Sequence, residues 1–223
     1  NYVLIRDASE EKIAKKHSIG LTELKRTIDS SLQKLDPERN KRNRPRLDDK
    51  ILTSWNGLML NGLVDAYRYL GNETYLELAL NNAEFILKNL VKPDGGLWHN
   101  HKNGKSTING YLEDYASTIE AFIGLYEVTF DEQWLTHANA LTSYCQKNFF
   151  DKESGLFFFT SKQDDYIIRR TIETTDNVVP SSNSIMAKNL LKLSKLFPNK
   201  GYEEKALQML LHQTPLCSKS EQA

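Results

Sequence analysis

The sequence predicts an all-α protein built from repeated αα-hairpins, arranged as a helical toroid or solenoid. Three observations predict this fold. Apolar residues recur at helical spacing in paired segments along the 223-residue chain. Short polar breaks divide each pair, and an aromatic residue and an alanine recur at matching positions of successive pairs. Such matched positions are typical of stacked helical repeats.

An amphipathic helical region comes first, over residues 9–35, with Thr22 as a candidate N-cap of its second helix. Asp36-Pro37 is expected to end that helix, because proline has no backbone N–H. The polar, basic segment 38–46 is expected to be a loop. The predicted parts are an N-terminal helical segment over 1–36, a partial toroid domain over 37–213 and a polar tail over 214–223.

Three hairpins are expected after the basic loop. Tyr67 precedes Ala79 by 12 positions, and Tyr126 precedes Ala138 by the same number. A bulky side chain beside a small one suits the place where two helices meet. The expected helix pairs are 53–69 with 73–91, 112–129 with 132–148, and 181–197 with 201–212.

The two long connections between hairpins each predict a small β-ribbon. In the first, Asn103-Gly104 forms a turn signal between residues 95–101 and 105–108. In the second, residues 155–160 and 166–169 flank Asp164-Asp165. Both ribbons are expected on one rim of the helical assembly.

Composition excludes several classes of function. Twenty-nine basic residues balance 29 acidic ones, so no net charge favours nucleic acid or an anionic membrane as a partner. No apolar stretch is long enough to span a membrane. Cys145 and Cys217 form no CxxC pair, so we expect no zinc site and a reducing, cytoplasmic compartment. The sequence contains no glycine-rich phosphate loop, and we expect no cofactor and no metal. The chain begins at Asn1 without a leader segment, and we expect it to be part of a longer protein.

Polar groups gather where the first helix of each hairpin begins. The acidic positions are spaced at about the hairpin period, so we expect them to meet on one rim, where helix N-termini favour negative charge. Asp49 and Asn56 are expected to share a helix face. The alternative is that each group only caps its helix. The groups are Asp48, Asp49, Lys50, Trp55 and Asn56; Glu113, Asp114 and Tyr115; and Asp176, Ser181, Ser182, Asn183 and Ser184.

Other polar residues are weaker candidates. The arginines of segment 39–46 are expected to pair with rim carboxylates such as Asp48 and Asp49 rather than with nucleic acid. His99 and His101 alternate on a predicted strand, and we expect them to face solvent, because no third metal ligand is evident nearby. Buried packing is expected for His137 and Cys145.

Three motifs resemble the signature of the YyaL-type, spermatogenesis-associated thioredoxin-domain protein family. They are RNRPRLDDKILTSWNGLM at 42–59, YLEDYA at 111–116, and Asp176 followed by PSSNS at 180–184. The resemblance covers residues 37–210. It implies a thioredoxin-like domain followed by an (α/α)6 toroid similar to N-acylglucosamine 2-epimerases and six-hairpin glycosidases. Only three toroid hairpins are expected in this chain, without the thioredoxin-like domain.

Two functions follow as hypotheses. The first is a sugar-binding or sugar-processing domain with Asp49 and Asp114 as the acid/base pair and Asp176 as the substitute. This hypothesis does not decide between hydrolysis of a glycosidic bond and epimerisation of a sugar. The second is a non-catalytic platform for a thioredoxin-like domain or another protein. The first expects the rim carboxylates to line a concave pocket to which Trp55 is exposed. The second expects Trp55 to be buried and each aspartate to be bonded to a backbone N–H or to an arginine. The substrate-binding residues expected for the first are Asp48, Lys50, Trp55, Asn56, Glu113, Tyr115, Ser181, Asn183 and Ser184.

Overall fold

The computed structural model describes residues 8–164 and 168–220, without the side chains of 199 and 212–220. The chain divides into two compact units, residues 1–48 and residues 49–223. In the first unit, α1 (Glu10–Lys16) is capped by Ser9, whose side chain accepts a hydrogen bond from the backbone of Lys12. It is followed by α2 (Leu21–Asn40), whose N-cap is Gly20 rather than the expected Thr22.

The expected end of this second helix was wrong, because α2 continues through Pro37 to Asn40. Proline cannot donate to the carbonyl four residues earlier, which belongs to Gln33. Gln33 is exposed, as are its neighbours along this half of the helix. Water can therefore satisfy the carbonyl that Pro37 leaves unbonded.

The three predicted hairpins are confirmed in the second unit. The expected end of the last helix was wrong, because α8 continues to Ser220 through most of the segment predicted to be a polar tail. A short 3-10 turn, η1 (Pro198–Lys200), joins the helices of the last pair. The helix pairs are α3 (Thr53–Leu70) with α4 (Glu73–Asn89), α5 (Leu112–Thr129) with α6 (Glu132–Asn148), and α7 (Ser182–Leu196) with α8 (Tyr202–Ser220).

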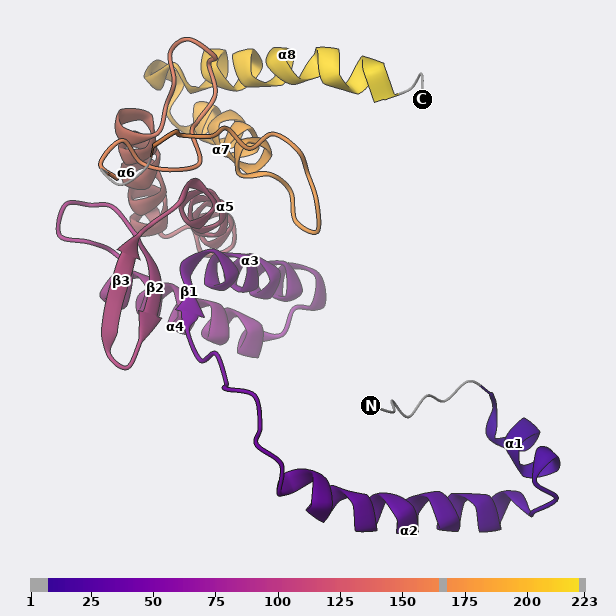
Figure 1. Ribbon diagram of the computed structural model, residues 1–223. Helices are drawn as coiled ribbons and strands as arrows, with labels where there is room; N and C mark the ends of the chain where they lie inside the picture. The colour runs from indigo at the N-terminus through magenta and orange to yellow at the C-terminus, as the bar shows by residue number, and fades with distance from the viewer. Residues whose placement is uncertain (1–7, 165–167, 221–223) are drawn as a thin grey trace. The chain divides into compact units, whose positions relative to one another are not determined.

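The hairpins form two layers of helices. In one layer α3 packs on α5 and α5 packs on α7, while α4, α6 and α8 each pack on their own partner in the other layer (Figure 1). Where the helices of a pair meet, the matched alanines Ala79, Ala138 and Ala206 are fully buried. The repeat inferred from the sequence is therefore a packing repeat, with a small residue at each close contact.

Helix α5 is the most enclosed element. It packs against α3, α6 and α7, and thirteen of its 18 residues are buried. A Cβ at Gly57 of α3 would lie 2.9 Å from the backbone carbon of Ser117, so only glycine permits this approach of α3 to α5. From the other side, the amide of Asn189 donates to the carbonyl of Ala116 at 2.8 Å.

A three-stranded antiparallel sheet in the order β1-β2-β3 lies beside the ends of α3 and α4 (Figure 1). Its strands are β1 (Ile51–Leu52), β2 (Trp98–Lys102) and β3 (Lys105–Asn109). The first predicted ribbon is thus confirmed, and both turn residues, Asn103 and Gly104, have the positive φ that a primed turn requires.

The second predicted ribbon is wrong where the structure describes it. Phe157 forms an isolated bridge with Phe150, and the backbone N–H of Phe159 donates to the carbonyl of Thr171 at 2.7 Å. Segment 155–160 therefore pairs with residues outside the expected partner segment, of which 166 and 167 lie outside the described residues. Across the described ranges, every helix is too short or too polar to cross a bilayer.

Candidate functional site

Asp114 joins the first turns of two inner helices. It is the third residue of α5, and its Oδ2 accepts a hydrogen bond of 2.9 Å from the backbone N–H of Tyr111. Its Oδ1 accepts one of 2.8 Å from the backbone N–H of Ser54 in α3. The side chain is fully buried. Both oxygens are held by the protein, so Asp114 is placed to orient other groups rather than to contact a ligand.

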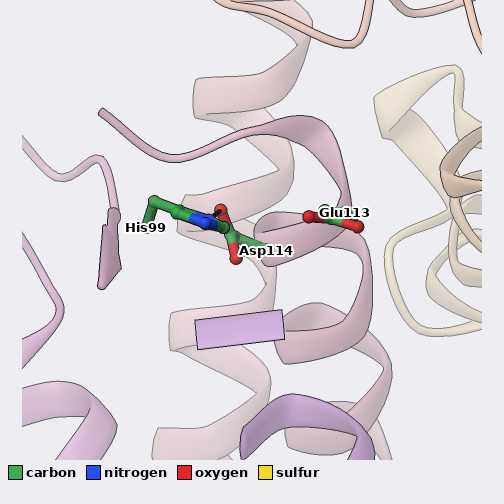
Figure 2. Close-up of side chains that lie close together, drawn as sticks. All are labelled: His99, Glu113 and Asp114. Atoms are coloured by element: carbon green, nitrogen blue, oxygen red, sulfur yellow. Dashed lines mark hydrogen bonds and ion pairs between the residues drawn. The ribbon is translucent and has the colours of Figure 1, made fainter. Parts of the chain in front are cut away.

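His99 of β2 is the third partner of this carboxylate. Its Nδ1 lies 2.9 Å from Oδ2 of Asp114 (Figure 2). The centroid of its ring lies 4.8 Å from that of the Tyr111 ring. The hydrogen bond to Asp114 raises the pKa of His99 above its ordinary value, and burial opposes this rise. Burial raises the pKa of Asp114, while His99 and two backbone N–H groups oppose that rise. The pair fixes the imidazole and directs Nε2 away from Asp114, where a fixed histidine can transfer a proton.

The position of His99 differs from expectation, since it was expected to face solvent. It is bonded to a buried carboxylate, while His101 bonds to Ser106 and contacts the ring of Phe85. One signal could have revealed this contact: the strand that carries both histidines leads through a tight ribbon directly into the acidic start of α5.

Glu113 lies next to this pair. Its side chain is half-buried, and polar atoms of Glu113, His99 and Asp114 lie within 4.8 Å of one another (Figure 2). Burial raises the pKa of Glu113, and the charges of Asp114 and Glu173 raise it further. A carboxyl whose pKa is raised can serve as a general acid. Imidazole and carboxylate groups also bind metal ions, and the absence of a metal at this site stays a prediction.

Glu173 is a second carboxylate whose charge reaches Glu113, and no sequence pattern indicated it. The backbone N–H of Leu112 donates to Phe159 at 2.9 Å, and Phe159 donates to Thr171, so segment 171–173 lies alongside the start of α5. Oε2 of Glu173 accepts hydrogen bonds from Ser182 N at 3.1 Å and Ser182 Oγ at 2.8 Å. The first turn of α7 thus anchors this exposed side chain.

Asp176 has mainly a structural role. Its Oδ1 accepts hydrogen bonds from the backbone N–H of Ser181 at 2.7 Å and from Ser184 Oγ at 3.0 Å, which lower its pKa. Ser181 is the N-cap of α7. The buried Asn183 exchanges two hydrogen bonds of 2.9 Å with the backbone of Phe157. Asp176, Asn183 and Ser184 also line a cavity of about 270 Å³ with apolar walls from Leu156, Ala187, Met209 and Leu210.

Asp49 does not share a helix face with Asn56, because α3 begins only at Thr53. Asp49 precedes β1 and pairs with Lys102 rather than with an arginine of the basic segment. Asp48 belongs to the first unit. Tyr115 is fully buried and accepts a hydrogen bond from the backbone of Leu97 at 2.8 Å, so its position does not suit the expected contact with substrate.

Trp55 is 70% exposed and lines a shallow hollow of about 530 Å³ together with Lys50 and Asn56. This exposure is the result that favours a sugar site over a protein platform. The hydrogen bonding of Asp114 and Asp176 to backbone groups is the result that the platform hypothesis and the capping alternative both expect. Of the predicted carboxylates, Glu113 combines a half-buried position with a raised pKa.

The paired helices define the fold class of the chain, that of the α/α toroids. Residues 51–213 match the family model of Glycosyl hydrolase family 76, and the chain belongs to this family. It is also similar to an uncharacterized protein of Caenorhabditis elegans, with 34% identity over 92% of this chain and 29% of that protein. Spermatogenesis-associated protein 20 of Rattus norvegicus is 29% identical over 94% of this chain and 28% of its own length. The chain therefore spans less than a third of these relatives.

Solved structures confirm the fold. A GH76 α-mannanase of Bacteroides thetaiotaomicron matches with a TM-score of 0.59 and 21% identity, over 76% of this chain and 46% of its own. A cellobiose 2-epimerase of Bacillus thermoamylovorans matches with a TM-score of 0.61 and 14% identity, over 74% and 45%. The three hairpins are thus part of an (α/α)6 toroid, as the resemblance implied.

Proposed function

We propose that this chain carries the acid/base groups of a carbohydrate-processing toroid, and that its reaction is hydrolysis of a glycosidic bond. The observation that carries the proposal is the environment of Glu113, half-buried beside Asp114 and close enough to Glu173 for that charge to raise its pKa. Membership of a glycosyl hydrolase family supports it. Glycoside hydrolysis uses two carboxyl groups, one protonated and one ionised.

In this mechanism Glu113 is the general acid. Burial and neighbouring negative charge keep its carboxyl protonated to higher pH, so it can donate a proton to the glycosidic oxygen as the bond breaks. Glu173 is exposed and anchored by Ser182, and it acts as the ionised partner that activates water or attacks the sugar. Asp114 holds His99 and the two helix starts in place. The pair Glu113 and Glu173 replaces the Asp49 and Asp114 of the sequence-based hypothesis.

A specific observation favours a second candidate, epimerisation or isomerisation of a reducing sugar. The imidazole of His99 is oriented by a buried carboxylate, and its pKa is raised. Such a histidine can remove a proton from the carbon next to a carbonyl, with Glu113 as the matching acid. This reaction needs the same side chains but leaves the glycosidic bond intact.

One experiment separates these reactions. The chain is incubated in D2O with α-linked mannooligosaccharides, chosen because one structural neighbour is an α-mannanase. New reducing ends indicate hydrolysis, and deuterium at C2 of the reducing sugar indicates epimerisation. Glu113→Gln should lower the rate at least 100-fold, the usual contribution of a general acid. Glu127→Gln is the control, because Glu127 pairs with Arg68 and Lys192 away from this site.

A folded chain without either activity would contradict the proposal and favour the platform hypothesis. For that hypothesis, the partner would be a thioredoxin-like domain of a longer protein, as the family resemblance implies. The length of the curated relatives, of which this chain spans 27–29%, leaves room for such a domain. Binding of the separately produced remainder of a relative to this chain would test that partnership.

A further inference from the structure

We propose that a hollow at the end of α2 binds the phosphoryl group of a small ligand, a function separate from that of the acid/base groups. The hollow has a volume of about 380 Å³, within the usual range of ligand sites, about 300–1,000 Å³. Within the part of the chain that the structure describes, its lining contains no carboxylate. The lining residues are Arg39, Arg42, Asn43, Arg44 and Pro45.

Basic residues are concentrated in the unit that contains this hollow. Residues 1–48 carry 12 basic and eight acidic side chains, whereas residues 49–223 carry 17 basic and 21 acidic ones. Five of the 12 basic residues lie within segment 39–46, which has no acidic residue. The balanced charge of the whole chain therefore includes a locally positive segment, which attracts an anion.

Two acidic residues near the segment pair with lysines instead of with the arginines of the hollow. Oε1 of Glu38 lies 2.6 Å from Nζ of Lys41, and Asp49 pairs with Lys102. Asp48 does not line the hollow. The carbonyl groups at the end of α2 add a partial negative charge of about half an elementary charge, which is smaller than the charge of three guanidinium groups.

The last turn of α2 brings the arginines together. The backbone N–H of Arg42 donates to the carbonyl of Arg39 at 3.1 Å, which holds both residues in one turn. Nη2 of Arg44 donates to Oδ1 of Asn40, so the protein orients this guanidinium group. Pro45 fixes its own φ and disfavours helical geometry at Arg44. Part of the site is thus ordered before a ligand binds, which lowers the entropic cost of binding.

The residue types of the lining favour a phosphoryl group. A guanidinium group presents parallel N–H donors that match two oxygens of a phosphate. A phosphate ester also carries a charge of about −1.5 to −2, which suits several arginines better than the single charge of a carboxylate. The described lining offers no aromatic side chain on which the bases of single-stranded nucleic acid could stack. The lining therefore favours a small phosphorylated ligand over nucleic acid.

The test is calorimetric titration of the whole chain, in phosphate-free buffer, with glycerol 3-phosphate, inorganic phosphate and glycerol. We expect both phosphoryl compounds to bind and glycerol to give no response. Arg42→Gln should weaken the binding about tenfold, the contribution of one hydrogen bond to a charged group. Arg26→Gln is the matched control, because Arg26 is exposed in the same helix, lies outside the lining and loses the same charge.

The two phosphoryl probes identify the source of the group. Tighter binding of glycerol 3-phosphate indicates a phosphate ester, equal binding indicates free phosphate, and both results support the site. Equal losses of affinity in Arg42→Gln and Arg26→Gln would show general attraction between charges and overturn the proposal. A single-stranded oligonucleotide that binds through Arg42 more tightly than both probes would overturn it in favour of nucleic acid. Absence of binding by a chain that melts cooperatively would also overturn it.

Discussion

Asp114 and Asp176 come from matching places in the repeat, yet the structure gives them different roles. Each precedes or begins an inner helix, and each accepts a hydrogen bond from a backbone N–H there. Asp114 is fully buried, because α3 covers the start of α5 on one side and β2 covers it on the other. Asp176 lies in an exposed loop. The comparison shows that the same capping hydrogen bond lets a carboxylate hold other side chains in place only where neighbouring helices or strands enclose that carboxylate.

The largest effect is expected from Asp114→Ala. This substitution leaves two backbone N–H groups and the Nδ1 of His99 without their acceptor in a buried place. Removing one partner of such a buried pair costs about 3–5 kcal/mol. Urea denaturation should show this loss in the free energy of unfolding. A loss below about 1 kcal/mol would mean that water reaches the site and that Asp114 resembles Asp176.

A smaller effect is expected from Gly57→Ala, which tests why the start of α5 is enclosed. The new Cβ would lie 2.7–2.9 Å from atoms of Ser117, so α3 must move away from α5. Overpacking of this kind costs about 1–3 kcal/mol. Gly62→Ala in the same helix meets nothing within 4 Å and should stabilise the chain by up to about 1 kcal/mol. Thermal unfolding of both variants measures the difference, and equal shifts would contradict the close approach.

Asp176→Ala should cost about 1 kcal/mol, the usual value for hydrogen bonds made near water. The two groups that lose their acceptor, Ser181 N and Ser184 Oγ, lie near the surface and can bond to water. Activity on an oligosaccharide should fall less than twofold. A loss as large as that of Glu113→Gln would restore Asp176 to the catalytic role that the sequence suggested, and the measurement is a kcat for each variant.

The smallest expected effect is a pH dependence of stability from His99. Its pKa is raised in the folded state by the hydrogen bond to Asp114. A raised folded-state pKa adds stability below the ordinary value of about 6.5, and this stability is lost as the pH rises through the folded-state pKa. Between pH 6 and 9 the unfolding free energy of the natural chain should therefore fall more than that of His99→Asn. Parallel curves would show that the pair does not couple to folding.

Much of the fold could be predicted from sequence, because its determinants are local. Glycine or phenylalanine in the left-handed conformation ends α3 and α5, at Gly71 and Phe130. Asn72 and Asp131 then cap α4 and α6 through their own side chains. These signals fall within a few residues of one another, as capping requires. The end of α2 had no such signal. This helix continues through Pro37 because water can satisfy the carbonyl that the proline leaves unbonded.

The site was less predictable, because its contacts join residues that are distant in sequence. Glu113 and Asp114 could be selected from their position in the repeat. Strand alternation placed His99 and His101 on one face of the strand, but the expectation that His99 faces solvent was wrong, because it bonds to Asp114 at the start of α5. The backbone hydrogen bond from Phe159 to Thr171 brings Glu173 beside the start of α5, and no sequence periodicity predicts this contact.

The enclosure of α5 has a consequence for how this chain loses structure. Three helices surround α5, whereas α4, α6 and α8 each rest mainly on one partner. Amide protons exchange with solvent only when their hydrogen bonds open, and the most enclosed elements open only with the whole domain. The amides of α5 therefore report global unfolding, while those of the outer helices report separate, local openings. Partial proteolysis would remove the edges of this assembly first and leave α5 with its nearest neighbours as the last protected fragment.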